Sequence, residues 1–289
     1  MQDNDILRQV RRIEIRARGL SRQLFSGEYH SAFKGRGMAF SEVREYQYGD
    51  DVRSIDWNVT ARLNHPYVKI FEEERELTVM LLVDVSRSNH FGTHQQSKQQ
   101  LAAEVAATLA FSAIANNDKV GVILFSDRIE KFIPPKKGST HILHIIRELI
   151  TFEPQGCGTD IGLALSHFTN VTKKRCSAFL LSDMVDGGNY TDALKIASKK
   201  HDLSVLRIED RREQALSNIG LVAMRDAETG QTLWVDTASK QMRSAYAQEQ
   251  AQRLAATEAT LQRYGIDHCT LQTGHDFVRP LIKLFKMRQ

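Results

Sequence analysis

The middle of the chain alternates between short apolar runs and longer segments with helical spacing of apolar residues. The mostly apolar runs, each ending in polar residues, cover 77–85, 119–126, 176–185 and 203–210. Such runs are typical of parallel strands covered on both faces. The segments with helical spacing cover 97–116, 139–152, 159–171 and 192–200. Strands that alternate with helices predict an α/β fold, a Rossmann-like, doubly wound and mostly parallel sheet.

The two flanking parts have different patterns. At the N-terminus Ile6, Val10, Ile13 and Ala17 recur at helical spacing, which predicts a helix that docks on the body and leaves its arginines in water. A glycine- and charge-rich segment follows, with short strand-like alternation. The C-terminal part predicts a hairpin around Gly230, a polar helix over about 238–264, a strand at 268–272 and a closing helix. We therefore expect three parts: a helix and β-rich or irregular extension over 1–76, the sheet domain over 77–210, and a hairpin-helix extension over 211–289 packed on the same body.

Charged residues gather in the segment that follows the predicted N-terminal helix. Asp50, Asp51 and Asp56 lie close in sequence to Arg44 and Arg53. We expect these side chains to cap turns and form ion pairs that fix this segment against the sheet, rather than to act as an acid/base cluster. Trp57 is expected to anchor the packing of this segment.

Composition narrows the class of protein. Of the 289 residues, 42% are apolar and 26% charged, as in ordinary globular proteins. No run of 18 apolar residues is present and the first 20 residues hold no uninterrupted apolar stretch, so we expect neither a membrane span nor a secretory signal. The three cysteines are far apart, which fits a reducing environment and a cytoplasmic protein.

The charge balance gives little sign of a nucleic-acid partner. The net charge is +4, and the arginine excess of the first 24 residues is not interleaved with aromatic side chains that could stack on bases. We therefore expect no nucleic-acid partner. The motifs G-x-x-x-x-G-K-[ST], G-x-G-x-x-G, G-x-S-x-G and H-E-x-x-H are absent from the sequence, so nucleotide hydrolysis and serine-hydrolase chemistry lack their usual carriers.

Oxygen-bearing side chains follow the predicted strands. The first run ends in Asp84-Val85-Ser86-Arg87-Ser88, and Thr159 opens a helix after two glycines. Asp183 ends the third run. Because ligands of open parallel sheets bind beyond the carboxyl ends of the strands, these groups are expected to converge. Two carboxylates and three hydroxyls suit a weakly held Mg²⁺ or Mn²⁺ rather than a calcium cage.

This ordered set resembles the metal-ion-dependent adhesion site of a von Willebrand factor type A domain. The resemblance covers about residues 77–210 and implies that Ser86, Ser88 and Thr159 bind the metal directly, with Asp84 and Asp183 acting directly or through water. The residue between the two serines is often glycine in such sites, and here it is Arg87. Its charge would lower metal affinity, unless it points outward to an acidic partner or pairs with Asp160 or Asp186.

The segment GEYHSAFKGRGMAFSEVREYQYGDDVRSIDWNVTARLNHPYVKIFEEERE closely resembles the N-terminal region of an uncharacterised bacterial family that carries such a domain. The tail, with DAETGQTLWVDT and FVRPLIKLFKMR, is similar to that family as well. Members are often found beside MoxR-type AAA+ ATPases, so the resemblance implies such an ATPase as a partner.

Two functions remain open at this point. The first is a non-enzymatic cytosolic adaptor that acts with a MoxR-type ATPase in complex assembly or maturation and binds protein clients presenting an acidic residue. The alternative is a Mg²⁺- or Mn²⁺-dependent, phosphoryl-directed hydrolase, in which Asp160 or His90 would orient water.

Overall fold

The computed structural model describes residues 3–25, 39–72, 77–90, 92, 96–225 and 230–288. The chain divides into two compact units, one formed by Met1–Phe33 with Thr78–Gln289 and the other by Lys34–Leu77. The N-terminal helix thus belongs with the sheet, whereas we had grouped it with the extension that follows it in sequence.

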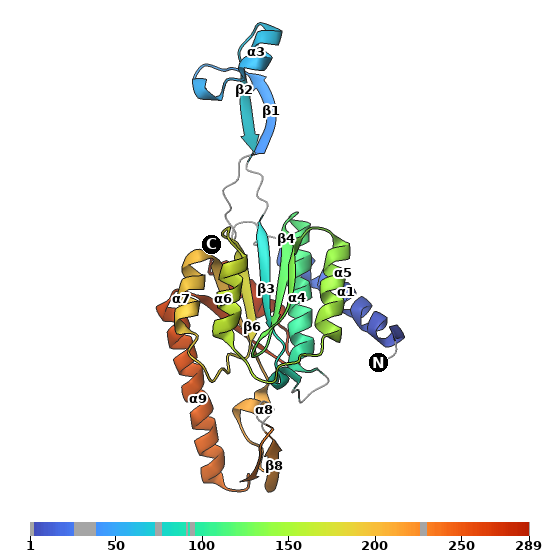
Figure 1. Cartoon of the computed structure of the whole chain (residues 1–289), viewed down its shortest axis with the longest axis vertical. Coiled ribbons are helices and arrows are strands. Elements are labelled where there is room, and N and C mark those ends of the chain that lie inside the picture. Colours follow the sequence, from blue (N-terminus) through green and yellow to red (C-terminus); the bar gives the residue numbers. More distant parts are fainter. Residues whose placement is uncertain are drawn as a thin grey trace. The chain divides into compact units, whose positions relative to one another are not determined.

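The larger unit is built on a six-stranded sheet in its described residues, in the order β10-β7-β6-β3-β4-β5. Figure 1 shows its strands β6, β3 and β4 side by side. Its strands are β3 (Thr78–Asp84), β4 (Lys119–Phe125), β5 (Ile129–Lys136), β6 (Ser177–Ser182), β7 (Asp202–Glu209) and β10 (Asp267–Gln272). All neighbouring pairs are parallel except β4 and β5. The predicted doubly wound, mostly parallel α/β sheet is confirmed.

Strand β5 was missed by the sequence pattern. It pairs antiparallel with β4 at one edge of the sheet, and its run contains Pro134 and Pro135. Proline cannot donate a backbone hydrogen bond, so it is confined to edge strands, bulges and strand starts. The local sequence therefore argues against a strand. The segment forms one only because one side of β4 is free to hydrogen-bond with it.

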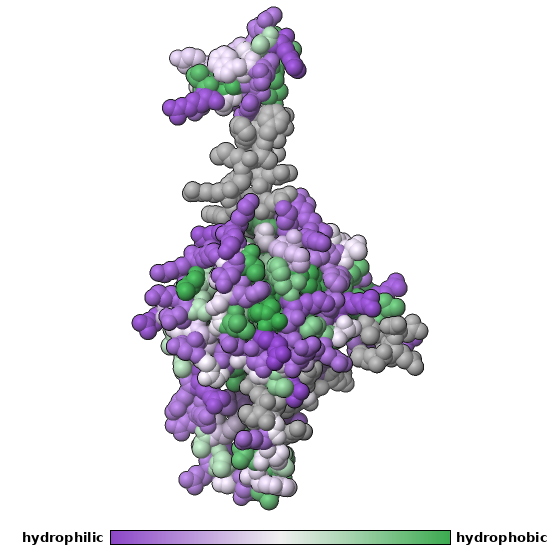
Figure 2. Space-filling view, viewed as in Figure 1, coloured by the Kyte–Doolittle hydropathy of each residue, from purple (hydrophilic) through white to green (hydrophobic). Residues whose placement is uncertain are grey.

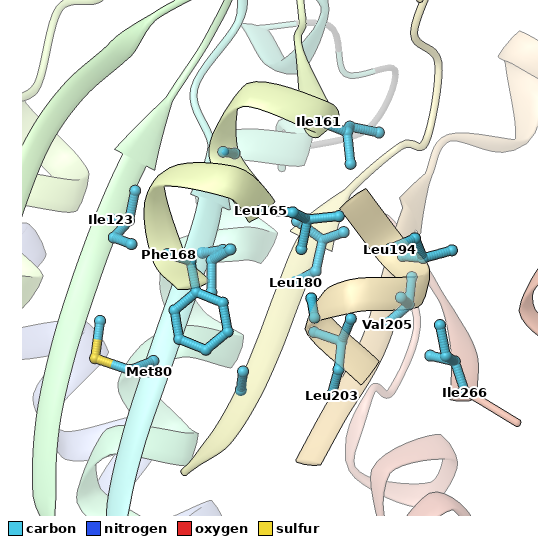
Figure 3. Packing of buried hydrophobic residues seen from close by; sticks show 14 of the residues in the cluster. Met80, Ile123, Ile161, Leu165, Phe168, Leu180, Leu194, Leu203, Val205 and Ile266 are labelled. Carbon is cyan, nitrogen blue, oxygen red and sulfur yellow. The ribbon is translucent and has the colours of Figure 1, made fainter. Parts of the chain in front are cut away.

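One face of the sheet is covered by α6 (Ile161–Val171) and α7 (Thr191–Lys200). Figure 3 shows Ile161, Leu165 and Phe168 of α6 among Met80, Ile123 and Leu180 of the strands. These side chains are almost fully excluded from solvent, and burying each one stabilises the fold by about 1.5–3 kcal/mol. The apolar runs of the sequence are therefore the core strands, as predicted.

The opposite face is covered by α10 (Val278–Lys286), whose Phe285 ring meets the Phe179 ring edge-on at 6.2 Å. Helix α4 (Lys98–Ala115) packs on β3, β4 and β7, and α5 (Ser139–Thr151) packs on α4. Helix α1 (Asp3–Phe25) packs on both α4 and α5 and buries Ile13 and Ala17. The predicted docking of the N-terminal helix is confirmed.

The C-terminal extension has the predicted elements. These are the antiparallel strands β8 (Leu221–Arg225) and β9 (Thr232–Asp236), and α9 (Lys240–Arg263), followed by β10 and α10. A short helix that was not predicted, α8 (Arg211–Gln214), precedes them. Helix α9 buries only Leu261, and the surface along it is mostly hydrophilic (Figure 2). Within the described residues, none of the helices is long and apolar enough to span a membrane.

The smaller unit contains β1 (Ala39–Glu45), η1 (Val52–Ser54), α3 (Trp57–Leu63) and β2 (Tyr67–Glu72). Asp51 and Asp56 cap η1 and α3, and Arg44 forms a two-bonded ion pair with Asp50. The expected capping and ion pairing are confirmed. Trp57 is 67% exposed on the first turn of α3, so it does not anchor the interior of this unit.

Candidate functional site

Two of the predicted carboxylates lie at the same edge of the sheet. Asp84 is the last residue of β3, and Asp183 directly follows β6, its parallel neighbour. The hydroxyl of Ser88 donates to Oδ2 of Asp183 at 3.0 Å and joins the two strand-end loops. The predicted convergence of Asp84, Ser86, Ser88 and Asp183 is therefore present in the structure.

The loop after β3 is held by its own polar groups. Oδ1 of Asp84 accepts the backbone N–H of Ser86 at 2.9 Å, and the hydroxyls of Ser86 and Ser88 lie 3.0 Å apart. The side-chain amide of Asn89 donates to the backbone carbonyl of Asp84. Because each bond joins residues at most five positions apart, the Asp-x-Ser-x-Ser sequence itself shapes the short 3-10 helix η2 (Arg87–His90).

Asp84 is buried and bonded on both oxygens. Its Oδ2 accepts the hydroxyl of Ser182 at 2.7 Å, so the ends of β3 and β6 are tied a second time. Burial, followed by the nearby charge of Asp183, raises the pKa of Asp84 from 3.8 to about 7.

Thr159 lies at the same edge, in the loop before α6. The next residue, Asp160, donates its backbone N–H to the carbonyl of Ser126, which directly follows β4. Gly156 opens this loop, donates its N–H to Glu130 and packs so closely that a methyl group there would lie 2.2 Å from the Ser126 hydroxyl. The loop is also tied to the loop after β6, because Asp186 accepts the N–H of Ile161.

A lysine and a glutamate, neither of them predicted from the sequence, complete the cluster. The ammonium of Lys98 lies 2.9 Å from Oδ2 of Asp183 and 2.7 Å from Oε1 of Glu213, which belongs to α8. The Lys98 side chain is 1% exposed. Burial opposes its charge, but Asp183 and Glu213 outweigh burial and raise the pKa of Lys98. Burial raises the pKa of Glu213 despite the nearby lysine.

One local signal could have indicated Lys98. It is the first residue of α4, directly after the N-cap Ser97. The N-terminus of a helix carries a partial positive charge, so a cation is unfavourable there without a specific acidic partner. No sequence rule identifies Glu213 as that partner, since it lies far along the chain in the C-terminal extension.

The charge of Lys98 decides whether this set of oxygens fits a metal ion. A Mg²⁺ on Oδ2 of Asp183 would lie about 2 Å from that oxygen and therefore within about 5 Å of the ammonium. Two like unit charges about 4 Å apart repel by about 4 kcal/mol at the effective dielectric constant of a protein surface. The described residues also contain no group of three or more His, Cys, Asp or Glu side chains arranged for a metal. While Lys98 is in place, the residues do not fit Mg²⁺ or Mn²⁺.

Of the arrangements considered from the sequence, Arg87 has the one that points outward to solvent. Its side chain is exposed, between the fully buried Ser86 and the partly buried Ser88. The carboxylates considered as its ion-pair partners have other contacts: Asp160 caps α6, and Asp186 accepts backbone N–H groups. Asp160, considered to orient water, thus has an ordinary capping role, and the side chain of His90 lies outside the described residues.

The doubly wound sheet with these strand-end loops defines a von Willebrand factor type A-like α/β protein. The structure is similar to that of the conserved hypothetical protein BatB from Bacteroides thetaiotaomicron, at 17% identity and a TM-score of 0.50 over 73% of this chain and 98% of that one. The SpRpn10 VWA domain is also similar, at 11% identity and a TM-score of 0.39 over 74% of this chain and 95% of that one.

The sequence comparisons identify the family. Residues 42–256 match the model of DUF58, a protein family of unknown function, and the chain belongs to this family. The uncharacterised protein Rv1480 of Mycobacterium tuberculosis is 28% identical over 284 residues, which cover 97% of this chain and 89% of the relative. YeaD of Bacillus subtilis, also uncharacterised, is 28% identical over 109 residues, which cover 38% of this chain and 25% of the relative.

Proposed function

We propose that the protein is a non-enzymatic interaction module that binds a protein partner at three loops, those following β3 and β6 and the one before α6. We further propose that it acts with a MoxR-type AAA+ ATPase in the assembly or maturation of protein complexes. The ATPase would supply the energy, and this protein would select or dock the client. The fold supports a role in protein interaction, and the resemblance of residues 27–76 supports the partner class.

The observation that carries the proposal is the position of Arg87. Its neighbours Ser86 and Ser88 hydrogen-bond within the buried cluster, while Arg87 itself is exposed. The backbone of Arg87 is therefore fixed, and its guanidinium is offered to solvent at the carboxyl edge of the sheet. A guanidinium presented in this way binds a carboxylate through two parallel hydrogen bonds.

The partner is accordingly a protein that presents an acidic residue. The surrounding loops add an exposed apolar side chain, Val185, which is 46% exposed directly after Met184. A charged contact beside an apolar one is the usual composition of a protein interface. The proposal does not require a metal ion.

The proposal is tested by measuring the affinity between the purified protein and a MoxR-type ATPase from the same genome. We expect Arg87→Ala to weaken binding about tenfold or more, because a hydrogen bond to a charged group contributes about 1.5–3 kcal/mol. Arg175→Ala is the matched control. Arg175 is exposed as well, but it lies two residues before β6 and therefore at the opposite end of the parallel strands.

Thr159→Ala tests the same surface through a second loop, and the melting temperature of each variant shows whether it folds. Full ATPase binding by folded Arg87→Ala and Thr159→Ala proteins would contradict the proposed docking surface.

Phosphatase assays with Mn²⁺ test the enzymatic alternative. Turnover that disappears in Asp84→Asn would show that the protein is a hydrolase instead.

A further inference from the structure

Lys98 occupies the centre of the strand-end cluster. Its ammonium donates to Asp183 and Glu213, and the oxygen of Asp183 that it contacts also accepts the hydroxyl of Ser88. Through these bonds one side chain of α4 connects the loop after β3, the loop after β6 and helix α8. A metal ion in the site predicted from the sequence would likewise join the loop after β3 to the loop after β6, through Ser88 and Asp183.

Burial of this lysine calls for an explanation. Lysine is almost never fully buried unless it is paired, and Lys98 is among the largest fully buried side chains of the described residues. The first position of α4 gives no helical reason for a cation, because the helix dipole opposes it there. The two carboxylates are therefore what keep the ammonium in the cluster.

A divalent cation and this ammonium would compete for the same oxygens. Both would be bound through Oδ2 of Asp183, and they repel each other at the separation which that shared ligand imposes. Lysine also carries a compact point charge at the end of a flexible side chain, so its ammonium can lie among oxygen atoms much as a bound ion does.

We propose that the ammonium of Lys98 is the resident cation of this site and takes the place that a metal ion holds in adhesion sites of this kind. The protein then holds its strand-end loops together without Mg²⁺, and the site is insensitive to chelators. This proposal is independent of which partner binds at the loops, since it concerns only the cation inside the cluster.

The first experiment is a Mn²⁺ titration followed by electron paramagnetic resonance. We expect the wild-type protein to bind no Mn²⁺ at this site up to millimolar concentrations and Lys98→Met to bind it at least about tenfold more tightly. That variant leaves Asp183 and Glu213 without the ammonium that pairs with them, while Asp183 still accepts the hydroxyl of Ser88. Lys131→Met is the control, because Lys131 pairs with a single carboxylate, Glu148, at a more exposed position.

Two results of this titration would overturn the proposal. One is wild-type protein that binds Mn²⁺ as tightly as Lys98→Met does, as the weak site predicted from the sequence would. The other is a folded Lys98→Met protein that binds no Mn²⁺, which would show that Lys98 does not occupy a metal position.

A second measurement uses the wild-type protein and so does not depend on how well Lys98→Met folds. In ¹H–¹⁵N spectra of lysine side chains, a buried ammonium exchanges slowly and gives its own signal. We expect one such signal that is absent from Lys98→Arg and unchanged by millimolar Mg²⁺ or by chelator. Loss of the signal on addition of Mg²⁺ would mean that the ion displaces Lys98 and would overturn the proposal.

Discussion

Buried polar side chains hold the core and the loops of this protein in specific positions. His201 is an example from the core: it directly follows α7, is fully excluded from solvent, and lies 4.3 Å from the ring of Phe168. Its Nδ1 contacts the thiol of Cys176, and its Nε2 has no hydrogen-bond partner in the described part of the chain. A proton on this ring would therefore be a buried and poorly compensated charge.

We predict a pH dependence of stability from His201. Burial, followed by the positive charges of Lys200 and Arg175, lowers its pKa from 6.5 to about 4. The unfolded chain therefore binds more protons between these values, so stability falls as pH falls from about 7 to about 4, by about 3 kcal/mol.

Urea unfolding at a series of pH values checks this prediction. His201→Gln should flatten the pH profile relative to wild type, because glutamine stays neutral. His144→Gln, at a side chain that is 51% exposed, should leave the profile as it is. Identical profiles for wild type and His201→Gln would contradict the assignment.

At the scale of elements, helices are held by the face that they bury. Helix α1 shows this with two isoleucines: Ile13 is 8% exposed against α4 and α5, whereas Ile15 is 66% exposed. We predict that Ile13→Ala destabilises the protein by about 2 kcal/mol or more and that Ile15→Ala changes stability by less than about 0.5 kcal/mol. Chemical unfolding followed by circular dichroism measures both, and equal losses would show that α1 is not docked through this face.

The loop before α6 depends on a glycine for a steric reason. A Cβ atom on Gly156 would lie 2.1 Å from Asp127 and 2.2 Å from Ser126, whereas one on Gly187 would meet nothing within 4 Å. We predict that Gly156→Ala lowers stability by about 1–3 kcal/mol, since Ser126 must shift, and that Gly187→Ala is neutral. Thermal melts test this difference, and a fully stable Gly156→Ala protein would refute the steric argument.

At the scale of the whole molecule, the chain forms two units with separate interiors. In the unit over Lys34–Leu77, the hydroxyl of Thr60 accepts the backbone N–H of Tyr67 and joins α3 to β2. We predict that Thr60→Val weakens this unit by about 1 kcal/mol and leaves the sheet unit unchanged. Hydrogen exchange should be faster only at amides of 39–72, and an equal change in β3 would show that the two units unfold together.

The sequence by itself determined the elements whose residues are close together along the chain. The apolar runs of β3, β4, β6 and β7 match strands buried on both faces, because local periodicity reports local burial. The Asp-x-Ser-x-Ser loop likewise follows from bonds between near neighbours. The carboxyl ends of neighbouring parallel strands lie together, so the meeting of Asp84 with Asp183 could be predicted as well.

Only the tertiary structure decided which cation lies inside the site. Lys98 and Asp183 are 85 positions apart, and Glu213 reaches them from the C-terminal extension. Likewise β5, with its two prolines, becomes a strand because β4 offers it an edge. In both cases the decisive interaction joins residues that are distant in sequence. The strength of such an interaction depends on the burial and charge of the groups that meet. No local sequence pattern contains these quantities, so the interaction exists only once the chain is folded.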